Sequence, residues 1–222
     1  KVMSDSAKVK IFFDNYSKGF SSIYNEDDKP RSTFDKFIDK FFRRAVFLRF
    51  KKTLEFTSNE NIKSILDLGC GPGHYVIEFL KQKKDVTALD IAPLMIELTE
   101  KRVANLNFDS EFKTITGDYM DIKFDKKYDA ICAMGFFDYI KDPVTVIKKL
   151  ISDCNKEIYI SIPDPYGILG LQRRVRYWLK NCPLYLYSYE RIIDVLKDAG
   201  CLENTDIIRM ERGFFIRIKI EH

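Results

Sequence analysis

The order of hydrophobic and polar residues from residue 64 onwards alternates between two patterns. Short apolar runs, typical of buried strands, are followed by segments whose apolar residues recur three and four positions apart, as on one face of a helix. The predicted strands cover Ile65–Leu68, Asp85–Asp90, Glu111–Thr116, Tyr128–Ala133, Glu157–Ile162, Thr205–Met210 and Phe214–Ile220. This alternation predicts an α/β fold in which helices cover both faces of a mostly parallel sheet, and the last two runs predict an antiparallel hairpin.

Local signals mark where several of the helices begin and end. Pro93 and Pro143 suit the first turn of a helix, where no N–H donor is needed. Asp142 and Ser188 have side chains that can accept a hydrogen bond from a free N–H group of the first turn. Gly200 predicts the end of the last helix, because glycine adopts the left-handed conformation that stops a helix.

The first 58 residues follow a different pattern and are predicted to form a helical lid or cap on a core formed by residues 59–222. Residues 1–31 are polar with interspersed aromatic rings, which predicts one short helix and a loop. Residues 33–55 predict a helix with apolar side chains on two nearly opposite faces. Three partners for the second face stay open: the rest of the chain, a second subunit or the substrate, and a membrane surface.

A glycine-rich loop follows the first predicted strand. Gly69, Gly71 and Gly73 stand at every second position between that strand and an amphipathic segment, which predicts a strand, a tight loop and a helix. Glycine permits positive φ and lets a ligand approach the backbone, while the N–H groups of the following helix point into the loop. Asp67, two residues before the first glycine, adds a negative charge that suits a cationic ligand.

This loop resembles motif I of the class I S-adenosylmethionine-dependent methyltransferases, in which an acid precedes three alternating glycines. The second landmark of that family, an acid at the end of the next strand, is matched by Asp90, seventeen residues after Gly73. A dinucleotide-binding loop is the alternative, because it also places an acid about 20 residues further on. Its third glycine is missing here, since His74 occupies that position.

The resemblance implies a Rossmann-like, seven-stranded sheet with S-adenosyl-L-methionine as the cofactor and S-adenosyl-L-homocysteine as the product. Asp67 would hold the ammonium group and Asp90 the ribose hydroxyls, through charge-assisted hydrogen bonds. Asp118 would accept from the adenine amine, although it is equally suited to cap a helix. The cofactor-binding residues implied are Asp67, Gly69, Cys70, Gly71, Gly73, Asp90, Ile91, Asp118, Tyr119, Ala133 and Met134.

The residues after the fourth predicted strand bear on the methyl acceptor. Many small-molecule O-methyltransferases of this family place a histidine there, whereas this chain has Phe136–Tyr139. Asp138, as a general base, and Tyr139 are the catalytic candidates, and a helix cap is the alternative role for Asp138. The missing histidine favours O-methylation of an acceptor that arrives ionised, such as a carboxylate, or a reaction in which alignment alone suffices.

A basic and aromatic insertion at about residues 163–187 is predicted to form the acceptor pocket. From Ile162 to Tyr177 it loosely resembles magnesium-protoporphyrin and ubiquinone-pathway O-methyltransferases. Arginines and aromatic rings together fit a small or medium-sized anionic acceptor, and a solvated basic face is the alternative. The candidate substrate-binding residues, two of them in the N-terminal lid, are Tyr16, Tyr24, Tyr166, Arg173, Arg174 and Tyr177.

Composition narrows the remaining alternatives. A net charge of +4 is too small to predict strong nucleic-acid binding, so an RNA or protein methyltransferase is the second hypothesis and a silent cofactor-binding subunit the third. Two histidines give no reason to expect a metal site. Five cysteines without a Cys-x-x-Cys pair, and no apolar stretch long enough to span a membrane, predict a cytoplasmic protein. A homodimer through the N-terminal helix stays open.

Overall fold

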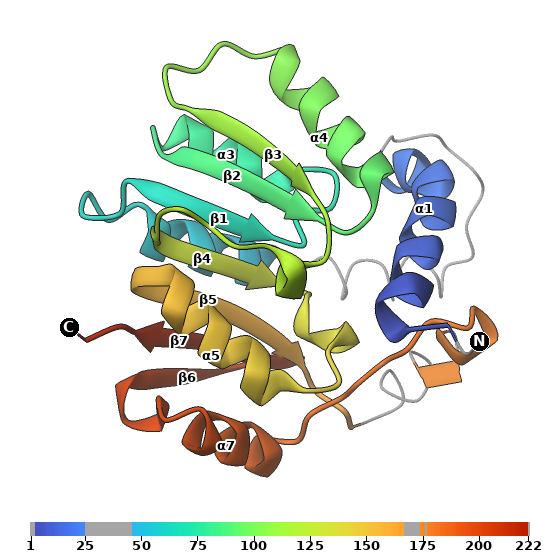
Figure 1. The fold of residues 1–222 in the computed structure, drawn as a ribbon, viewed down its shortest axis with the longest axis vertical. Helices are drawn as coiled ribbons and strands as arrows, with labels where there is room; N and C mark the ends of the chain where they lie inside the picture. Colours follow the sequence, from blue (N-terminus) through green and yellow to red (C-terminus); the bar gives the residue numbers. More distant parts are fainter. Residues whose placement is uncertain (1–2, 25–45, 167–173, 176, 222) are drawn as a thin grey trace.

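The computed structural model describes residues 3–24, 46–166, 174–175 and 177–221, and only the backbone of residues 16–24. A central sheet runs through the protein with helices packed around it (Figure 1). The N-terminal part contributes α1 (Asp5–Tyr24) and a helix over residues 46–57. The earlier part of the helix predicted over residues 33–55 lies outside the described residues.

Seven strands form one sheet in the order β3-β2-β1-β4-β5-β7-β6, which confirms the predicted fold class. The first five strands pair in parallel, and β7 pairs antiparallel with both β5 and β6. The predicted C-terminal hairpin is therefore confirmed. The strands are β1 (Ser64–Leu68), β2 (Asp85–Asp90), β3 (Phe112–Thr116), β4 (Tyr128–Met134), β5 (Cys154–Pro163), β6 (Thr205–Met210) and β7 (Gly213–Lys219).

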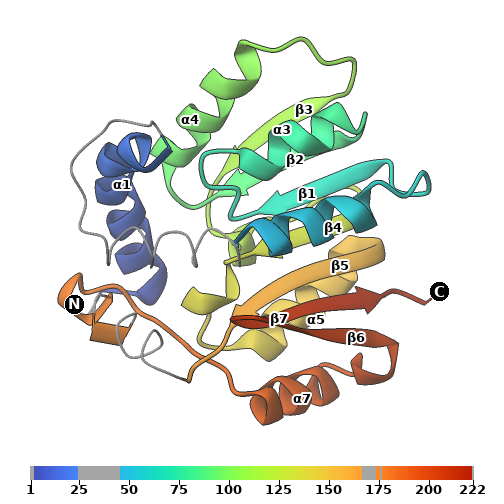
Figure 2. The same cartoon turned by 180° about the vertical axis from the view of Figure 1, so that it is seen from behind.

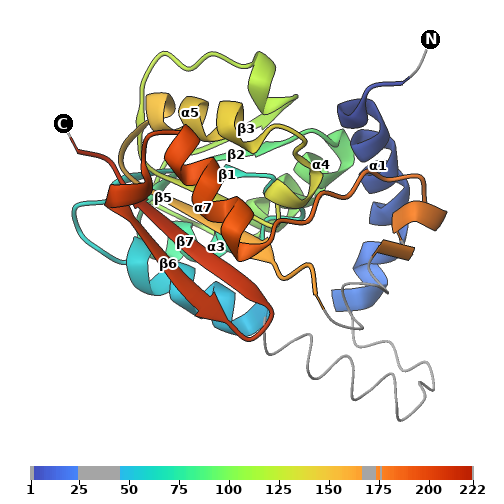
Figure 3. The same cartoon turned by 90° about the horizontal axis from the view of Figure 1, so that it is seen from below.

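Helices cover both faces of the sheet, because neighbouring residues of each parallel strand point to opposite sides. On β4, for example, Ala130 belongs to a core cluster with Phe79 and Ile96, whereas Ile131 belongs to one with Ile147. The first cluster lies under α3, α4 and the helix over residues 46–57, and the second lies under α5 and α7 (Figures 2 and 3). The bounds are α3 (His74–Lys81), α4 (Pro93–Ala104), α5 (Pro143–Asp153) and α7 (Tyr189–Asp198), with short 3-10 helices η1 (Tyr119–Asp121), η2 (Phe137–Tyr139) and η3 (Leu202–Asn204).

The predicted helix signals are confirmed. The side chain of Asp142 accepts a hydrogen bond from the Thr145 N–H at 3.3 Å, and Ser188 accepts one from the Arg191 N–H at 3.3 Å. Each bond satisfies one of the donors that a helix leaves free at its N-terminus. Gly200 has a φ of 76° directly after α7, in the conformation that ends a helix.

The first helix is longer than its sequence predicts. A short helix was expected because glycine destabilises a helix interior by about 1 kcal/mol, yet α1 spans 20 residues and continues through Gly19. Tertiary packing overrides the local preference, since Val9 and Phe12 are buried in a cluster with Tyr177 and Cys182. The expectation of a short helix is therefore wrong, and the loop expected after it lies outside the described residues.

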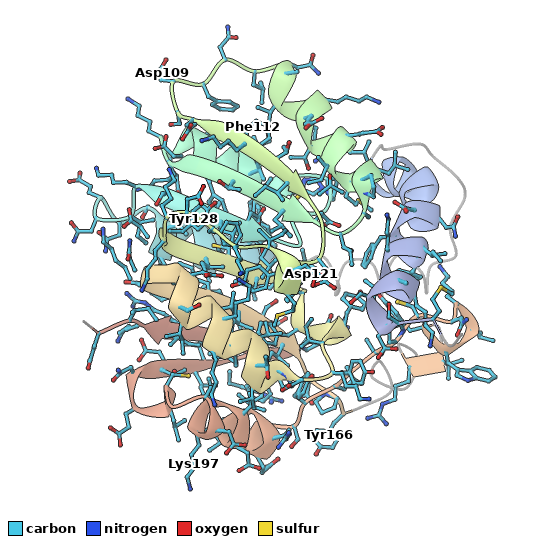
Figure 4. All side chains as sticks on the ribbon, in the orientation of Figure 1. Asp109, Phe112, Asp121, Tyr128, Tyr166 and Lys197 are labelled. Carbon is cyan, nitrogen blue, oxygen red and sulfur yellow. The ribbon has the colours of Figure 1, made fainter. Side chains whose placement is uncertain are left out.

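The carboxyl ends of the parallel strands lie along one edge of the sheet, and α1 stands across that edge (Figure 1). The 3-10 helix η1, marked by Asp121 in Figure 4, lies on the same side. In open α/β sheets this edge is where ligands bind. None of the helices that the structure describes is long and apolar enough to cross a membrane.

Candidate cofactor and acceptor site

The three glycines between β1 and α3 all have positive φ, but their surroundings differ. A Cβ on Gly69 would lie 3.3 Å from the ring of Phe136, and one on Gly73 would lie 2.7 Å from the methyl group of Thr99. At Gly71, with φ of 53°, a Cβ would meet no atom within 4 Å. Gly69 and Gly73 therefore allow close packing within the protein, whereas Gly71 leaves its backbone open at the carboxyl edge.

The loop is tied to the end of β2 and to α4. The N–H groups of Gly69 and Cys70 both donate to the carbonyl of Leu89, at 2.8 and 3.1 Å. The hydroxyl of Thr99 donates to the Gly71 carbonyl at 2.9 Å and lies 3.9 Å from the Cys70 sulfur. Burial raises the pKa of the Cys70 thiol, so this cysteine acts as a buried packing residue. Sequence reasoning missed Thr99, which lies in a helix interior without a local signal.

Asp90 ends β2 and fixes the other side of the loop. One carboxylate oxygen accepts from the Gly71 N–H and the other from the Ala92 N–H, both at 2.9 Å. The side chain is only 7% exposed, and this burial raises its pKa. Each carboxylate oxygen has a second lone pair, so Asp90 can accept two further hydrogen bonds from a ligand.

Asp67 is a buried carboxyl group whose hydrogen bonding is incomplete. It is 1% exposed, and its Oδ2 atom has no hydrogen-bond partner among the described residues. Burial, with a further contribution from the charge of Asp90, raises its pKa from 3.8 to about 8. Leaving a buried polar atom unpaired is costly, and such groups are characteristic of binding sites. A cationic hydrogen-bond donor would satisfy this one.

A half-buried cation, Arg49, lies at the same edge. Arg49, on the helix over residues 46–57, donates from Nη1 to the Ser161 hydroxyl at 3.2 Å, and this nitrogen lies 4.0 Å from where Gly135 would carry a Cβ. Its Nε atom is buried without a hydrogen-bond acceptor, and no described carboxylate forms an ion pair with it. The sequence did not predict that Arg49 would lie at this edge.

The phenol of Tyr75 lies near both Asp67 and Arg49. Burial is the largest effect on this phenol and raises its pKa, while the charge of Arg49 lowers it and that of Asp67 raises it. The phenol therefore lies within electrostatic reach of both groups. Thr53, one turn after Arg49, donates to the sulfur of Met134 at 3.6 Å. The end of β4 is thus packed against the same helix that carries Arg49.

Two of the predicted acceptor-site residues come together beneath α1. The hydroxyl groups of Tyr139 and Tyr177, on separate segments, lie 3.0 Å apart. Phe13 of α1 meets the Tyr139 ring edge-on at a centroid distance of 5.3 Å, and Ile91 packs against the same cluster. The structure thus places Ile91, the candidate neighbour of the adenine, and the acceptor-site candidates Tyr139 and Tyr177 under one helix.

Other predicted cofactor-binding residues have side chains that are buried or already hydrogen-bonded within the protein, so less of each side chain is open to a ligand. Asp118 caps η1, because its Oδ1 accepts from the Met120 N–H at 3.1 Å, as the alternative reading expected. The ring of Tyr119 is 1% exposed and its hydroxyl donates to Asp153 at 2.7 Å, which leaves only its backbone for a ligand. Ala133 is fully buried at the end of β4.

The remaining acceptor candidates are scattered. Tyr166 is 71% exposed and lies near the end of β5, at the periphery (Figure 4). Arg174 is exposed, and Asp138 is 3% exposed within η2. Arg173 and the side chains of Tyr16 and Tyr24 lie outside what the structure describes.

The histidine next to the loop is a structural residue. His74 begins α3, and its ring nitrogens lie 3.0 and 3.2 Å from the Arg102 guanidinium. Burial and the charge of Arg102 lower the pKa of His74 to about 4. The imidazole is therefore neutral at physiological pH, and its ring nitrogens contact Arg102 rather than Tyr139 or Tyr177.

The geometry places a candidate ligand site at the carboxyl edge of the sheet of an α/β protein. Comparison with known proteins indicates what kind of protein has this arrangement. A protein-family model described as a methyltransferase domain matches residues 65–156, which run from β1 into β5. The match includes the glycine loop, Asp90 and η2.

Curated relatives are methyltransferases of several kinds. The chain is 30% identical over 123 residues to a tRNA U34 carboxymethyltransferase of Nautilia profundicola, covering 54% of this chain and 39% of that protein. It is 33% identical over 89 residues to a malonyl-(acyl-carrier protein) O-methyltransferase of Priestia megaterium, covering 39% and 31%. The chain thus matches about a third of the length of these relatives.

Solved structures extend the likeness to nearly the whole chain. The magnesium protoporphyrin IX methyltransferase of Synechocystis, crystallised with S-adenosylhomocysteine, has a TM-score of 0.74 at 14% identity and covers 96% of this chain and 98% of its own. A second structure of that enzyme holds S-adenosylmethionine. The chain has the fold of the class I S-adenosylmethionine-dependent methyltransferases, and residues 65–156 match the methyltransferase-domain model, as the family resemblance predicted.

The raised pKa of Asp67 predicts a pH-dependent stability difference. Because the folded pKa lies above the unfolded value of 3.8, the carboxyl group stabilises the unliganded fold most in acid, and this contribution is lost as the pH rises to about 8. We expect Asp67→Asn to gain stability over the wild type between about pH 5 and pH 8, by at most roughly 1.4 kcal/mol per pH unit. Urea denaturation across this range measures it.

The matched control is Asp109→Asn, which removes an exposed carboxylate in the loop before β3. Its stability difference from the wild type should vary little over the same range. A difference for Asp67→Asn that does not change with pH would show that this carboxyl group does not titrate abnormally.

Proposed function

We propose that the protein transfers the methyl group of S-adenosylmethionine to a small or medium-sized anionic acceptor. The observation that carries the proposal is a pair of incompletely hydrogen-bonded side chains beside a glycine loop, the acid Asp67 and the base Arg49. S-Adenosylmethionine ends in an amino acid with one ammonium and one carboxylate. The two residues offer an acceptor for the first and a donor for the second.

The other parts of the cofactor fit the neighbouring groups. Asp90 has two lone pairs left for the two ribose hydroxyls, after its bonds to Gly71 and Ala92. Gly71 offers an open stretch of backbone for the methionine portion to pass. Ile91 provides an apolar surface for the adenine, and Asp118 keeps one carboxylate oxygen beyond its helix cap. The bound cofactor in a neighbour of the same fold supports this arrangement.

The reaction requires alignment more than functional groups. A lone pair of the acceptor forms a bond to the methyl carbon, the carbon–sulfur bond breaks, and its electrons return to sulfur to give neutral S-adenosylhomocysteine. Holding the two molecules in line and excluding water supplies much of the acceleration. We assign α1 and the rest of residues 1–58 the role of a lid, because α1 stands across the carboxyl edge (Figure 1).

The acceptor would lie beside the Tyr139–Tyr177 pair. Two hydroxyl groups 3.0 Å apart can donate to a carboxylate, and the rings of Phe12 and Phe13 supply an apolar wall. A carboxylate oxygen needs no base, which agrees with the neutral, engaged His74. Asp138, buried in η2, is retained as a candidate base for an acceptor that arrives protonated. The malonyl relative supports an acidic acceptor.

Methylation of RNA is the second candidate, and one relative favours it. The Nautilia carboxymethyltransferase acts on a tRNA nucleotide and matches more of this chain than the malonyl enzyme does. The chain's net charge of +4 provides little electrostatic attraction for a polynucleotide. An acidic small molecule is therefore the preferred acceptor.

Removing the Asp90 carboxylate should weaken cofactor binding. Loss of charge-assisted hydrogen bonds costs about 1.5 to 3 kcal/mol, so Asp90→Ala should raise the dissociation constant for S-adenosylhomocysteine about tenfold or more. Isothermal titration calorimetry measures this. Asp142→Ala is the matched control, because Asp142 also accepts a backbone N–H bond but caps α5. Unchanged affinity in folded Asp90→Ala would remove the ribose contact from the account.

The acceptor class can be tested with pairs of molecules that differ only at the reacting group. We expect S-adenosylhomocysteine to form with small carboxylic acids and not with the corresponding amides, because an ionised oxygen is the nucleophile. Mass spectrometry would identify the methyl ester. Transfer to tRNA but to none of the acids would favour RNA methylation, and transfer to acids and amides alike would contradict selection of an anion.

A further inference from the structure

The segment beside α1 carries an apolar face that points outward. Residues 174–175 and 177–179 are helical, and Val175, Trp178 and Leu179 are 48%, 77% and 71% exposed. Their spacing of three and four positions places them on one side of the helix. Tyr177 is only 8% exposed and packs toward α1. The buried and exposed faces are thus both apolar, which a helix in contact with water alone does not require.

The N-terminal half of α1 extends this surface. Met3 and Ile11 are 45% and 47% exposed, and they border a groove of about 330 Å³ between α1 and the 180–181 turn. The groove is lined by Met3, Lys8, Ile11, Phe12, Asn15, Lys180 and Asn181. We call Met3, Ile11, Val175, Trp178 and Leu179 the outer apolar patch. The segments that carry it, α1 and residues 177–181, lie side by side in Figures 1 and 3.

Basic residues flank the outer apolar patch along the sequence. The stretch from residue 173 to residue 180 contains four basic residues and no acidic one. Lys8 and Lys180 line the groove, and the Lys180 ammonium lies 5.6 Å from the centre of the Phe12 ring. Lys8 forms an ion pair with Asp5 at 3.8 Å, and Asp5 also accepts a hydrogen bond from the Tyr185 hydroxyl.

We propose that the outer apolar patch docks the protein on an anionic membrane surface. Tryptophan and aliphatic side chains flanked by lysine and arginine are the composition that enters the boundary between lipid headgroups and acyl chains. The basic residues beside the patch, among them Lys8, Arg174 and Lys180, would attract negative headgroups, and the groove between Lys8 and Lys180 can take a phosphate. Contact is peripheral, because the described helices are too short or too polar to span a bilayer.

Docking would place the lid against the membrane. Both α1 and the 174–181 segment border the Tyr139–Tyr177 cluster, so a membrane bound here lies next to the proposed acceptor site. The docking itself does not depend on methyl transfer, since the patch lies on the outer side of these segments. A binding experiment without cofactor or acceptor therefore tests it independently of the proposed function.

The single tryptophan of the chain, Trp178, provides a direct probe. Vesicles of phosphatidylcholine mixed with phosphatidylglycerol should shift its fluorescence to shorter wavelength and protect it from acrylamide quenching. Vesicles of phosphatidylcholine alone should have a much smaller effect, and high salt should weaken the response, because attraction to the headgroups is screened.

Variants locate the contact. Val175→Ser combined with Leu179→Ser should weaken co-sedimentation with the anionic vesicles by about tenfold, as should Lys8→Glu combined with Lys180→Glu. All four side chains lie at the surface or the groove, so the fold should persist, and circular dichroism checks this. Leu106→Ser is the matched control: this residue is 44% exposed and follows the C-terminal end of α4, the end that points away from α1 (Figure 1).

Three results would overturn the proposal. One is the absence of any Trp178 response to anionic vesicles. Another is vesicle binding that the patch variants reduce no more than Leu106→Ser does. The third is that the protein does not bind lipid but instead self-associates or binds an acidic carrier protein, and that Val175→Ser combined with Leu179→Ser abolishes this association.

Discussion

The site depends on a carboxyl group that the fold buries and leaves incompletely bonded. Asp67 lies inside the sheet at the end of β1, where it cannot reach water, and one of its oxygens has no partner among the described residues. The strand and the glycine loop fix its position, because Gly69 and Cys70 are bonded to the end of β2. A cation at this point would relieve the cost of burial, so ligand binding and stability are coupled at one residue.

The helix over residues 46–57 supplies the complementary charge. Arg49 donates to Ser161 of β5 and lies close to Gly135, and its neighbour Phe50 packs on Tyr75, which follows the glycine loop. An acidic and a basic side chain at one edge favour a zwitterion over a simple anion or cation. In the proposed site α1 would act as the lid, since its aromatic residues pack in one cluster with Tyr139 and Ile91.

Local patterns predicted the sheet and the loop well, because both depend on short-range rules. Alternation of strands and helices gave the fold class, and the spacing of Asp67, the glycines and Asp90 located the loop that the structure places at the carboxyl edge. Arg49, Ser161 and Thr99 were not predicted, since each is an ordinary polar residue whose importance comes from tertiary contacts. The length of α1 was missed for the same reason, as packing of Phe12 outweighs Gly19.

The most direct test of this account compares two ligands of the unmodified protein. S-Adenosylhomocysteine and 5′-methylthioadenosine share the adenosine and the sulfur, but only the first has the ammonium and carboxylate assigned to Asp67 and Arg49. Calorimetric titration should show S-adenosylhomocysteine binding about a hundredfold or more tightly, because two charge-assisted contacts of about 1.5 to 3 kcal/mol each are absent from the other ligand. Equal affinities would contradict the assignment of the two charges.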